Sequence, residues 1–558
     1  MFNAFHRWIR ACVWLCSAAS GGALGASFDP GSAQLSMPRV IVDAAATYTT
    51  VVIRLNSFGA LAVDDPAVGS AVEYHSGSNR LLLPSVTVGS TTYRRVSLTG
   101  ASFDLVGVGA RVATVDAGAP VAPVSSASLA GTKDTGFGTF GYRNTTAPAR
   151  AILKAVPLPE RRQIYLFGSH GTAGILGRSI VRLTEDGAVD ATYGTNGVYE
   201  RSDPTLELNI RAFAVDSSGR AYVVSWPNGS DGPQGAQVTR LDATGQPDTT
   251  FGAAGSVTLN SAQPAGHPYS HIRVATTLAD DSLLLAGYAA TTREGTTRSW
   301  VIWKLLPGGQ LDTRFGNQGV AAIPTGAADE PSVLTVARSG DIYLSGRRGD
   351  TDKTWVVARF DADGVPDAAY GSGGFASVGT GTARAVHDLR VDSAGGLLVV
   401  GHATGTTNRQ QAWVTRLQPT GRVDADFGTQ GQTFVNYYNQ PTPVGSDTFA
   451  DTATRVWFDG SGRILVGGYA LDKSFNGTST AYSTVTRLLP GGQIDPSFFG
   501  GVPNALAQAA NYGFISRFPA TNIWEGEVRP VLPAADGSSV LGVLMQANTT
   551  VYSVVRWR

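Results

Sequence analysis

The chain of 558 residues is almost without cysteine, and its two cysteines, Cys12 and Cys16, both lie near the N-terminus. Both precede the start of the mature chain that is predicted below. The mature chain therefore has no disulfide, no thiolate metal site and no cysteine nucleophile. An exported chain without disulfides depends on its apolar core for stability.

Charge is also scarce. Charged residues make up 15% of the chain, and the 43 basic and 43 acidic side chains cancel. A net charge of zero gives no electrostatic footprint for nucleic acid, so no nucleic-acid partner is expected. No apolar run approaches the roughly 18 residues of a membrane span, so the mature chain is expected to have no transmembrane span. The 68 glycines, together with many Val, Thr and Ser residues, favour a turn-rich β protein.

Residues 1–25 have the features of a secretory signal peptide. A basic start is followed by an apolar segment at 11–19 and by a zone of small residues at 20–26. Ala23-Leu24-Gly25 fits the small-x-small cleavage rule, which places cleavage after Gly25. The sequence thus predicts an exported protein of the periplasm, the outer surface or the extracellular medium.

Residues 26–108 contain a tandem repeat. Residues 28–42 and 74–88 share a pattern of alternating apolar residues with a period of 45 or 46 residues, which is typical of strands. Each copy is too small to bury a core of its own, so the two copies are expected to share one. We interpret this module as a β spacer, with an attachment or assembly domain as the alternative. Residues 109–130 have the Ala/Pro/Ser-rich composition of a linker.

Residues 131–558 contain seven copies of the pattern G-x-x-D-x-x-[FY]-G-x-x-G, of which the seventh is irregular. Each copy has an aspartate and, three residues later, an aromatic residue. These pairs are Asp134/Phe137, Asp190/Tyr193, Asp248/Phe251, Asp312/Phe315, Asp367/Tyr370, Asp424/Phe427 and Asp495/Phe498. Each unit also contains four strand-like runs and no sustained helical periodicity. Seven four-stranded units in tandem predict an all-β fold, a seven-bladed β-propeller of four-stranded blades preceded by the small tandem module.

A basic residue ends the fourth strand-like run of every unit. The seven residues are Arg182, Arg240, Lys304, Arg359, Arg416, Arg487 and Arg556. The motif aspartate stands eight residues after each of the first six. A charge at a packed boundary between blades is costly unless it is paired, so we predict a repeated ion pair. In a closed ring, the unmatched Asp134 and Arg556 would meet. The motif is therefore interpreted as part of the scaffold.

The units resemble the delta-60 repeat family. The resemblance rests on a strand ending in Arg-Leu, a turn with glycine and then D-x-x-F-G-x-x-G, as in residues 416–431, and it covers about residues 131–558. It implies an exported or surface protein of bacterial origin with a propeller-like fold. It implies no catalytic residues, because the family has no general activity.

Candidate metal and catalytic groups are few. His267 and His271 are spaced like ligands on a helix but fall in a proline-containing loop, and Asp361 and Asp363 recur in no other unit. We interpret both pairs as parts of surface loops or turns. No cofactor, metal site or catalytic residue is predicted.

Six residues are the candidate ligand-binding groups. Units six and seven carry long insertions rich in aromatic residues, which contain Tyr437 and Tyr438, and Tyr512 and Trp524. Irregular loops on a rigid scaffold are where binding sites concentrate, and such aromatics suit stacking on a sugar or peptide. The alternative is that they form a satellite core under the loops. His387 and Arg455 precede the second strand of neighbouring units, where they are expected to line a face near the channel.

Taken together, the sequence predicts a secreted or cell-surface propeller that acts as a non-catalytic binding module for a glycan, a peptide or a surface protein. Two alternatives remain open. One is an extracellular propeller hydrolase or lyase that acts on a polymer, which needs paired carboxylates or His and Arg in one pocket. The other is a purely structural surface protein.

Overall fold

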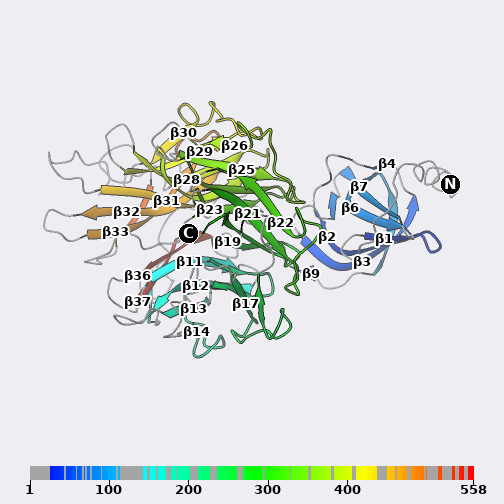
Figure 1. The fold of residues 1–558 in the computed structure, drawn as a ribbon, viewed down its shortest axis with the longest axis horizontal. Coiled ribbons are helices and arrows are strands. Elements are labelled where there is room, and N and C mark those ends of the chain that lie inside the picture. Colours follow the sequence, from blue (N-terminus) through cyan, green and yellow to red (C-terminus); the bar gives the residue numbers. More distant parts are fainter. Residues whose placement is uncertain are drawn as a thin grey trace. The chain divides into compact units, whose positions relative to one another are not determined.

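The computed structural model divides the chain into two compact units, Met1–Thr114 and Val115–Arg558. Every element in its described residues is a β-strand (Figure 1). The described residues are 26–42, 46–57, 60–63, 65, 68, 72–75, 78–88, 91–107, 111–112, 142–146, 151–158, 161–170, 177–184, 187–201, 212–225, 236–259, 267, 269–292, 295, 297–326, 329–349, 354–378, 383–404, 410–435, 449–458, 462–473, 479–495, 498, 513–517, 531–533, 540–545 and 551–557. The predicted signal peptide, most of the predicted linker and Asp134 lie outside these residues. Within them, no helix is long and apolar enough to span a bilayer.

The N-terminal unit is one mixed sheet of nine strands. Its strands are β1 (Ala26–Asp29), β2 (Gln34–Val42), β3 (Ala46–Ser57), β4 (Ala60–Ala62), β5 (Glu73–His75), β6 (Arg80–Val88), β7 (Thr91–Thr99), β8 (Ser102–Gly107) and β9 (Arg111–Val112). The β1–β3 meander repeats the β5–β7 meander. The prediction of a small β-rich module with an internal repeat is confirmed.

The two copies of the tandem repeat are interlocked. Strand β1 pairs in parallel with β6 of the other copy, and β5 pairs in parallel with β2. The registers match, because Phe28 lies opposite Val88 and Tyr74 lies opposite Val42. The alternating apolar residues of both copies pack into one cluster of buried side chains. Each copy thus completes the other, as expected for repeats that cannot bury a core alone.

The second unit is a β-propeller. Four of its sheets are antiparallel meanders of four consecutive strands, and these are described first. They are β11 (Ala151–Leu158), β12 (Gln163–His170), β13 (Gly177–Thr184) and β14 (Val198–Arg201); β15 (Ala212–Val215), β16 (Ala221–Ser225), β17 (Gln237–Leu241) and β18 (Ser256–Thr258); β19 (Tyr269–Thr277), β20 (Leu283–Ala290), β21 (Arg298–Leu305) and β22 (Val320–Pro324); and β23 (Glu330–Val336), β24 (Ile342–Arg348), β25 (Thr354–Phe360) and β26 (Phe375–Ser377).

The next sheet has eight strands in two meanders. The first meander comprises β27 (Ala383–Val391), β28 (Leu397–Thr404), β29 (Gln410–Leu417) and β30 (Gln432–Val435), and the second comprises β31 (Phe449–Phe458), β32 (Ile464–Lys473), β33 (Ser479–Leu488) and β34 (Gly513–Arg517). A single parallel pairing, Gln410 with Ala450, joins the two meanders.

The last sheet closes the ring with both ends of the propeller sequence. Its strands are β10 (Tyr142–Thr146), β35 (Val531–Pro533), β36 (Val540–Met545) and β37 (Val551–Trp557). β10 pairs with β37 in an antiparallel register from Tyr142–Val555 to Thr146–Val551. This pairing joins residues about four hundred positions apart, so the sheet exists only when the ring is closed. The predicted meeting of Asp134 with Arg556 lies outside the described residues.

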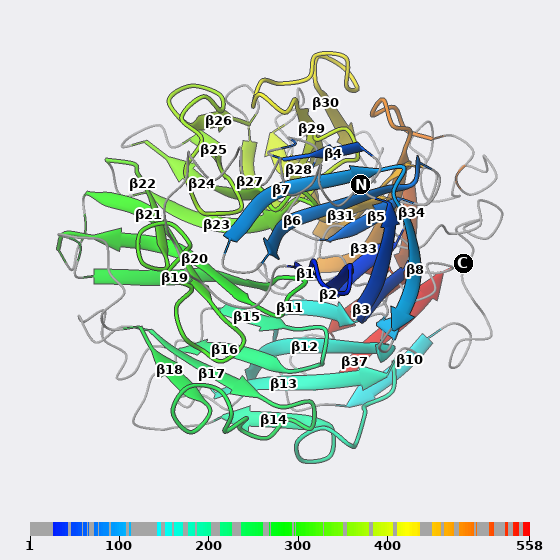
Figure 2. The same cartoon turned by 90° about the vertical axis from the view of Figure 1, so that its right-hand side faces the viewer.

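The first strand of each meander lies at the centre of the propeller (Figure 2). β15 contacts β19, β19 contacts β23, β23 contacts β27 and β27 contacts β31, so these strands follow one another around an axis. Clusters of buried side chains lie between successive sheets, as in the cluster that joins β15–β18 to β19–β22. Large residues such as Trp300, Trp303 and Trp413 fill these spaces. The strands between these clusters therefore bury both of their faces.

The predicted ion pair recurs between the third strand of each meander, which is the fourth strand-like run of the sequence pattern, and the turn that follows it. The six pairs are Arg182 with Asp190 (2.9 Å), Arg240 with Asp248 (2.8 Å), Lys304 with Asp312 (3.2 Å), Arg359 with Asp367, Arg416 with Asp424 (2.6 Å) and Arg487 with Asp495 (2.7 Å). The six predicted contacts are thus present. The hairpin that joins the two residues accounts for the constant spacing, because the aspartate N–H donates to the carbonyl of the basic residue.

The same basic residue also contacts the motif aromatic and the neighbouring sheet. In all six cases its cationic group lies 4.6–5.8 Å from the centroid of the motif ring. Four of the arginines donate Nη1–H to a carbonyl in the next turn: Arg182 to Ala243, Arg240 to Pro307, Arg359 to Pro419 (2.8 Å) and Arg416 to Pro490 (2.8 Å). We call the unit of cation, aspartate and ring the clamp, and in these four cases a next-turn carbonyl completes it.

The clamp has one strict requirement for glycine. The turn glycine of the following sheet packs against the preceding motif with a positive φ, as Gly245 does at φ 83°. A Cβ on Gly245 would lie 2.8 Å from the backbone nitrogen of Gly194 and 3.1 Å from the Tyr193 ring. Neither the conformation nor the space suits another residue. This explains why glycine recurs at the turn before the motif.

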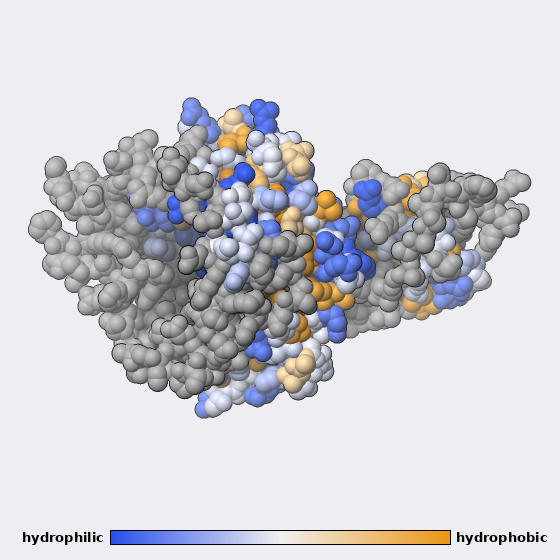
Figure 3. All heavy atoms as spheres, viewed as in Figure 1, coloured by the Kyte–Doolittle hydropathy of each residue, from blue (hydrophilic) through white to orange (hydrophobic). Residues whose placement is uncertain are grey.

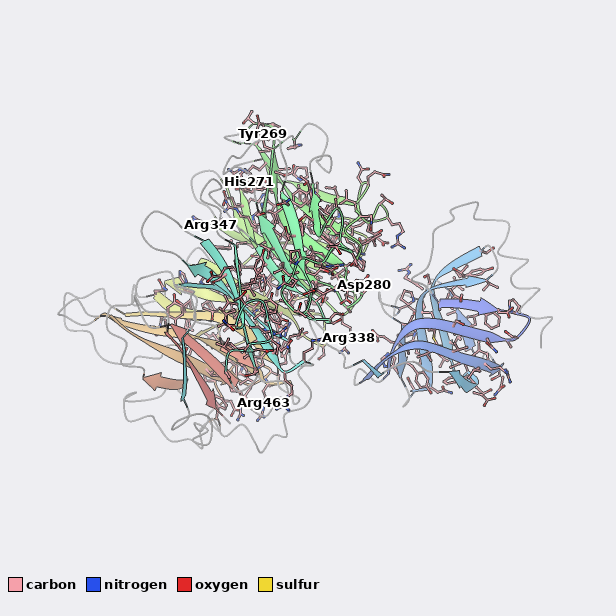
Figure 4. The ribbon with its side chains drawn as sticks, turned by 90° about the horizontal axis from the view of Figure 1, so that it is seen from below. Tyr269, His271, Asp280, Arg338, Arg347 and Arg463 are labelled. Carbon is pink, nitrogen blue, oxygen red and sulfur yellow. The ribbon has the colours of Figure 1, made fainter. Side chains whose placement is uncertain are left out.

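The propeller has two different faces. We call the face with the motif turns the motif face, and the opposite face, where the first strands begin, the variable face. On the visible surface in Figure 3, hydrophilic and apolar residues are interspersed over the described part. Figure 4 separates residues of the two faces: Tyr269, His271 and Arg347 lie at strand ends of the variable face, and Asp280, Arg338 and Arg463 lie in or beside turns of the motif face.

Candidate ligand site at the propeller axis

A β-bulge turns side chains of the central strands toward the axis. Five central strands, β11, β19, β23, β27 and β31, shift register opposite a glycine of the neighbouring strand. A Cβ on Gly287 would lie 1.7 Å from the carbonyl oxygen of His271, and one on Gly401 would lie 1.9 Å from that of Ala385. The glycine that ends each second-strand run therefore admits the bulge, which re-aims the side chains beside it.

The residue that resumes pairing after each bulge occupies one level of the ring. These residues are Lys154, Val274, Val333, Asp388 and Arg455. All five are partly accessible to solvent. Three of the five are charged, although the strands that carry them are otherwise alike. The repeat therefore fixes the position of these residues but not their charge, which differs from unit to unit.

Lys154 crosses the axis to two neighbouring sheets. Its Nζ donates to the carbonyl oxygen of Phe213 in β15 at 2.8 Å and to that of Ala275 in β19 at 3.0 Å. These carbonyls belong to the inner edges of their sheets, where no further strand can pair with them. Burial of the ammonium group, and then repulsion from Arg455, lower the pKa of Lys154 to about 8, against the opposing effect of Asp388.

Arg455 and Asp388 extend the group of charges across the axis. Arg455 Nη2 donates to the carbonyl oxygen of Ala155 in β11 at 2.8 Å. Its Nη1 lies 4.0 Å from Asp388 Oδ1, at the outer limit of an ion pair. Asp388 Oδ2 accepts the backbone N–H of Val456 at 2.9 Å. We call Lys154, Asp388 and Arg455 the axial cluster.

Two of the predicted ligand-binding residues, His387 and Arg455, fall at this level. The sequence analysis placed both residues just before the strand that forms the centre of each meander. They lie instead inside these central strands, β27 and β31. The expectation is corrected because the bulges let these strands continue through residues that break the apolar alternation. His387 is the bulged residue next to Asp388, and its Nε2 shares a hydrogen bond of 3.2 Å with Nδ1 of His402. Although part of its side chain reaches solvent, desolvation lowers the pKa of His387, and Asp388 opposes this shift.

The other four predicted residues, Tyr437, Tyr438, Tyr512 and Trp524, lie outside the described residues. Their role in ligand binding stays a prediction. The Asp361 turn is described, and the Asp361 carboxylate accepts the backbone N–H groups of Asp363 and Val365. Among the described residues, no group of three His, Cys, Asp or Glu side chains is placed to hold a metal ion.

A second polar cluster lies toward the variable face, between β19–β22 and β23–β26. Glu330 receives Arg273 at 2.9 Å and Arg298 at 2.8 Å, one on each carboxylate oxygen. Burial alone would raise the pKa of Glu330, but the two arginines outweigh it and the pKa is lowered. Arg273 Nε is buried without a hydrogen-bond partner. We call Arg273, Arg298 and Glu330 the rim cluster.

An aromatic ring supports the rim cluster. The guanidinium carbon of Arg298 lies 3.9 Å from the centroid of the Tyr288 ring, and His271 stacks on the same ring at 4.6 Å. Tyr288 is itself buried, whereas the Glu330 side chain is 42% exposed. Arg298 is thereby held in one orientation with its partner carboxylate open to solvent, which suits recognition of a polar ligand.

Sequence reasoning did not identify Lys154, Arg273, Arg298 or Glu330 as candidates. The one sequence feature that could have pointed to them is the glycine that ends the second strand of a meander. The β-bulge that turns side chains toward the axis lies opposite this glycine. Residues aligned on that glycine are apolar in some units and charged in others. The partners gave no signal, since Lys154 and Ala275 are 121 residues apart and meet only through the curvature of the ring.

Comparisons with known proteins find only distant likenesses among solved structures. No family model matches the chain, and no curated protein matches it. A protein of unknown function from Dyadobacter fermentans is 10% identical with a TM-score of 0.37, over 62% of this chain and 99% of that one. Prolyl oligopeptidase B from Galerina marginata is 10% identical with a TM-score of 0.31, over 82% of this chain but only 55% of the peptidase. The SapL1 lectin, in complex with alpha methyl fucoside, is 13% identical with a TM-score of 0.29, over 61% of this chain and 93% of the lectin. At such scores these likenesses carry no argument about activity.

Proposed function

We propose that the protein is an exported β-propeller that binds an extracellular ligand without catalysis, and that its ligand contacts the variable face. One observation carries the proposal. The charged residues shared by the units are engaged in clamps on the motif face, whereas the charges of the rim cluster and the axial cluster are not repeated from unit to unit among the described residues. Repetition is what a scaffold requires, and departure from repetition on one face is what a ligand site requires.

We also infer that the propeller has seven blades, with the eight-stranded sheet counted as two. The single pairing between Gln410 and Ala450 supports this count. A clamp supports it as well, because Arg416 of one meander bonds to Pro490 of the next, as separate sheets do elsewhere in the ring. Buried side chains also pack between the two meanders. Seven blades then agree with seven motif copies.

The ligand class follows from the groups at the variable face. Arginine forks, a stacked tyrosine and an accessible carboxylate recognise hydroxyl, amide and acidic groups together. A glycan or an extended peptide presents such groups along a polymer. The aromatic residues Tyr437, Tyr438, Tyr512 and Trp524 are proposed to add stacking contacts to the same ligand. Export is proposed from residues 1–25, and the delta-60 repeat resemblance supports both export and a role without chemistry.

The test is a binding screen of residues 26–558 on glycan and peptide arrays. Arg298→Gln removes the charge held over Tyr288 and is expected to weaken binding at least about tenfold. A variant with Tyr437→Ala, Tyr438→Ala and Trp524→Ala tests the insertion loops separately. Arg422→Gln is the matched control, because Arg422 is an exposed arginine of the motif face and is expected to change nothing.

Three outcomes decide the proposal. Binding lost with Arg298→Gln and kept with Arg422→Gln supports a ligand site on the variable face. Equal binding by both variants contradicts it. Shortening of an arrayed polymer by the wild-type protein would instead establish the alternative, a hydrolase or lyase, and would direct attention to His387, His402 and Asp388.

A further inference from the structure

The axial cluster carries more positive than negative charge. Lys154 and Arg455 are its two basic side chains, and Asp388 is its one carboxylate. Among the described residues, no carboxylate forms an ion pair with Lys154, which donates to two neutral carbonyls. Two like charges in a partly desolvated space raise the free energy of the folded state unless an anion joins them.

The clamp shows how this chain treats a cation that serves only the fold. Each of the six clamp cations has a carboxylate at 3.2 Å or less. Arg455 has its carboxylate at 4.0 Å, and Asp388 directs its other oxygen to the backbone of Val456. Within the described residues, the axial cluster therefore lacks the close carboxylate that the clamps supply six times.

The axial cluster is also reachable. Arg455 and Asp388 keep 33% and 18% of their side chains exposed. Val274 and Val333 at the same level of the ring are partly accessible, and the ammonium group of Lys154 is buried beside them. An anion at this level of the ring would therefore lie near two cations and beside the apolar side chains of Val274 and Val333. Such a setting strengthens an ionic hydrogen bond relative to bulk water.

We propose that the propeller axis is an anion-binding site in which Lys154 and Arg455 hold a carboxylate or phosphate group together. Asp388 sets the selectivity by opposing the anion and by holding the β31 backbone. The inference deepens the proposed function, because it assigns an acidic group to the ligand, but it stands on the axial cluster and not on the rim cluster. It can therefore fail or succeed independently of the array screen.

The experiment is isothermal titration of residues 26–558 with acetate and with inorganic phosphate at neutral pH and low salt, with chloride at matched ionic strength as the control. The wild-type protein is expected to bind acetate or phosphate and not chloride. Lys154→Met keeps the length of the side chain and removes its charge, so binding should weaken at least about fivefold. Preference for acetate or for phosphate tells whether the natural group is a carboxylate or a phosphate.

A second variant separates binding from folding. Asp388→Asn keeps an oxygen for the Val456 N–H but removes the opposing charge, so it should tighten binding by a similar factor. General damage to the fold would weaken binding in both variants, whereas the proposal requires opposite effects. Arg422→Gln should bind like the wild-type protein. Binding that Lys154→Met leaves unchanged, or a response to chloride equal to that of acetate and phosphate, overturns the proposal.

Discussion

The motif face and the variable face of the propeller are built from the same strands but follow different rules. On the motif face, six cations pair with six aspartates and lie over six aromatic rings. On the variable face, Arg273, Arg298 and Glu330 meet once, and no other unit repeats this arrangement in its described residues. The difference indicates that the motif face holds the ring together and that the variable face is free to differ.

The axis joins the two faces and shares features of both. Its bulges and glycines recur from unit to unit, as the clamps do. Its charges do not recur, as on the variable face. Lys154 connects three sheets through backbone carbonyls, and Arg455 connects β31 with β11 on the far side of the closing sheet. The axial cluster is therefore expected to affect both stability and binding.

The largest expected effect is the loss of a clamp. Arg240→Met removes a buried cation and leaves Asp248 without its partner and Phe251 without its cation. We expect the free energy of unfolding to fall by about 3–5 kcal/mol, as measured by urea denaturation. The comparison is Arg314→Met, which removes an arginine that is 58% exposed and pairs with Asp312. Arg314→Met should lower the free energy of unfolding by less than about 1 kcal/mol. If Arg240→Met and Arg314→Met lower it equally, the clamp does not stabilise the fold as a buried unit.

The next effect is a dependence of stability on pH that comes from Lys154. Burial holds the pKa of Lys154 at about 8 in the folded protein, below its ordinary value of 10.5, so the unfolded chain holds more protons between these values. The free energy of unfolding should therefore rise as the pH increases from about 8 to about 10.5, by at most about 3 kcal/mol from this group. Denaturation of wild-type and Lys154→Met proteins across this range isolates the contribution. A wild-type curve no steeper than that of the variant would contradict the assigned shift.

A smaller effect separates space from backbone conformation on the motif face. Gly245→Ala places a methyl group 2.8 Å from the Gly194 nitrogen, and it forces alanine to adopt φ 83°. Gly326→Ala imposes a similar conformation, φ 79°, with no atom within 4 Å of the new Cβ. We expect the free energy of unfolding to fall by about 1 kcal/mol for Gly326→Ala and by about 2–3 kcal/mol for Gly245→Ala, as measured by thermal or urea denaturation. If the two losses are equal, contact between neighbouring sheets is not what requires Gly245.

Much of the motif face could be predicted from the sequence, because its contacts are local. Arg240 and Asp248 are eight residues apart and joined by one hairpin, so a constant spacing implied the pair. The bond from Arg240 to Pro307 could not be predicted, since it depends on the curvature of the ring. His387 and Arg455 were found through their charge, but their positions within the strands required knowledge of the bulges. Lys154 was missed because its partners, Phe213 and Ala275, lie in other units and act through backbone oxygens.

The most direct test of the division between the two faces is hydrogen exchange of the full mature chain, with and without a ligand selected on the arrays. The account predicts that the ligand protects backbone amides of Tyr269–Arg273 and of the start of β21 at Arg298, and leaves the motif turns around Asp248 and Asp424 unchanged. Protection confined to those motif turns would contradict it, because the repeated face would then carry the ligand.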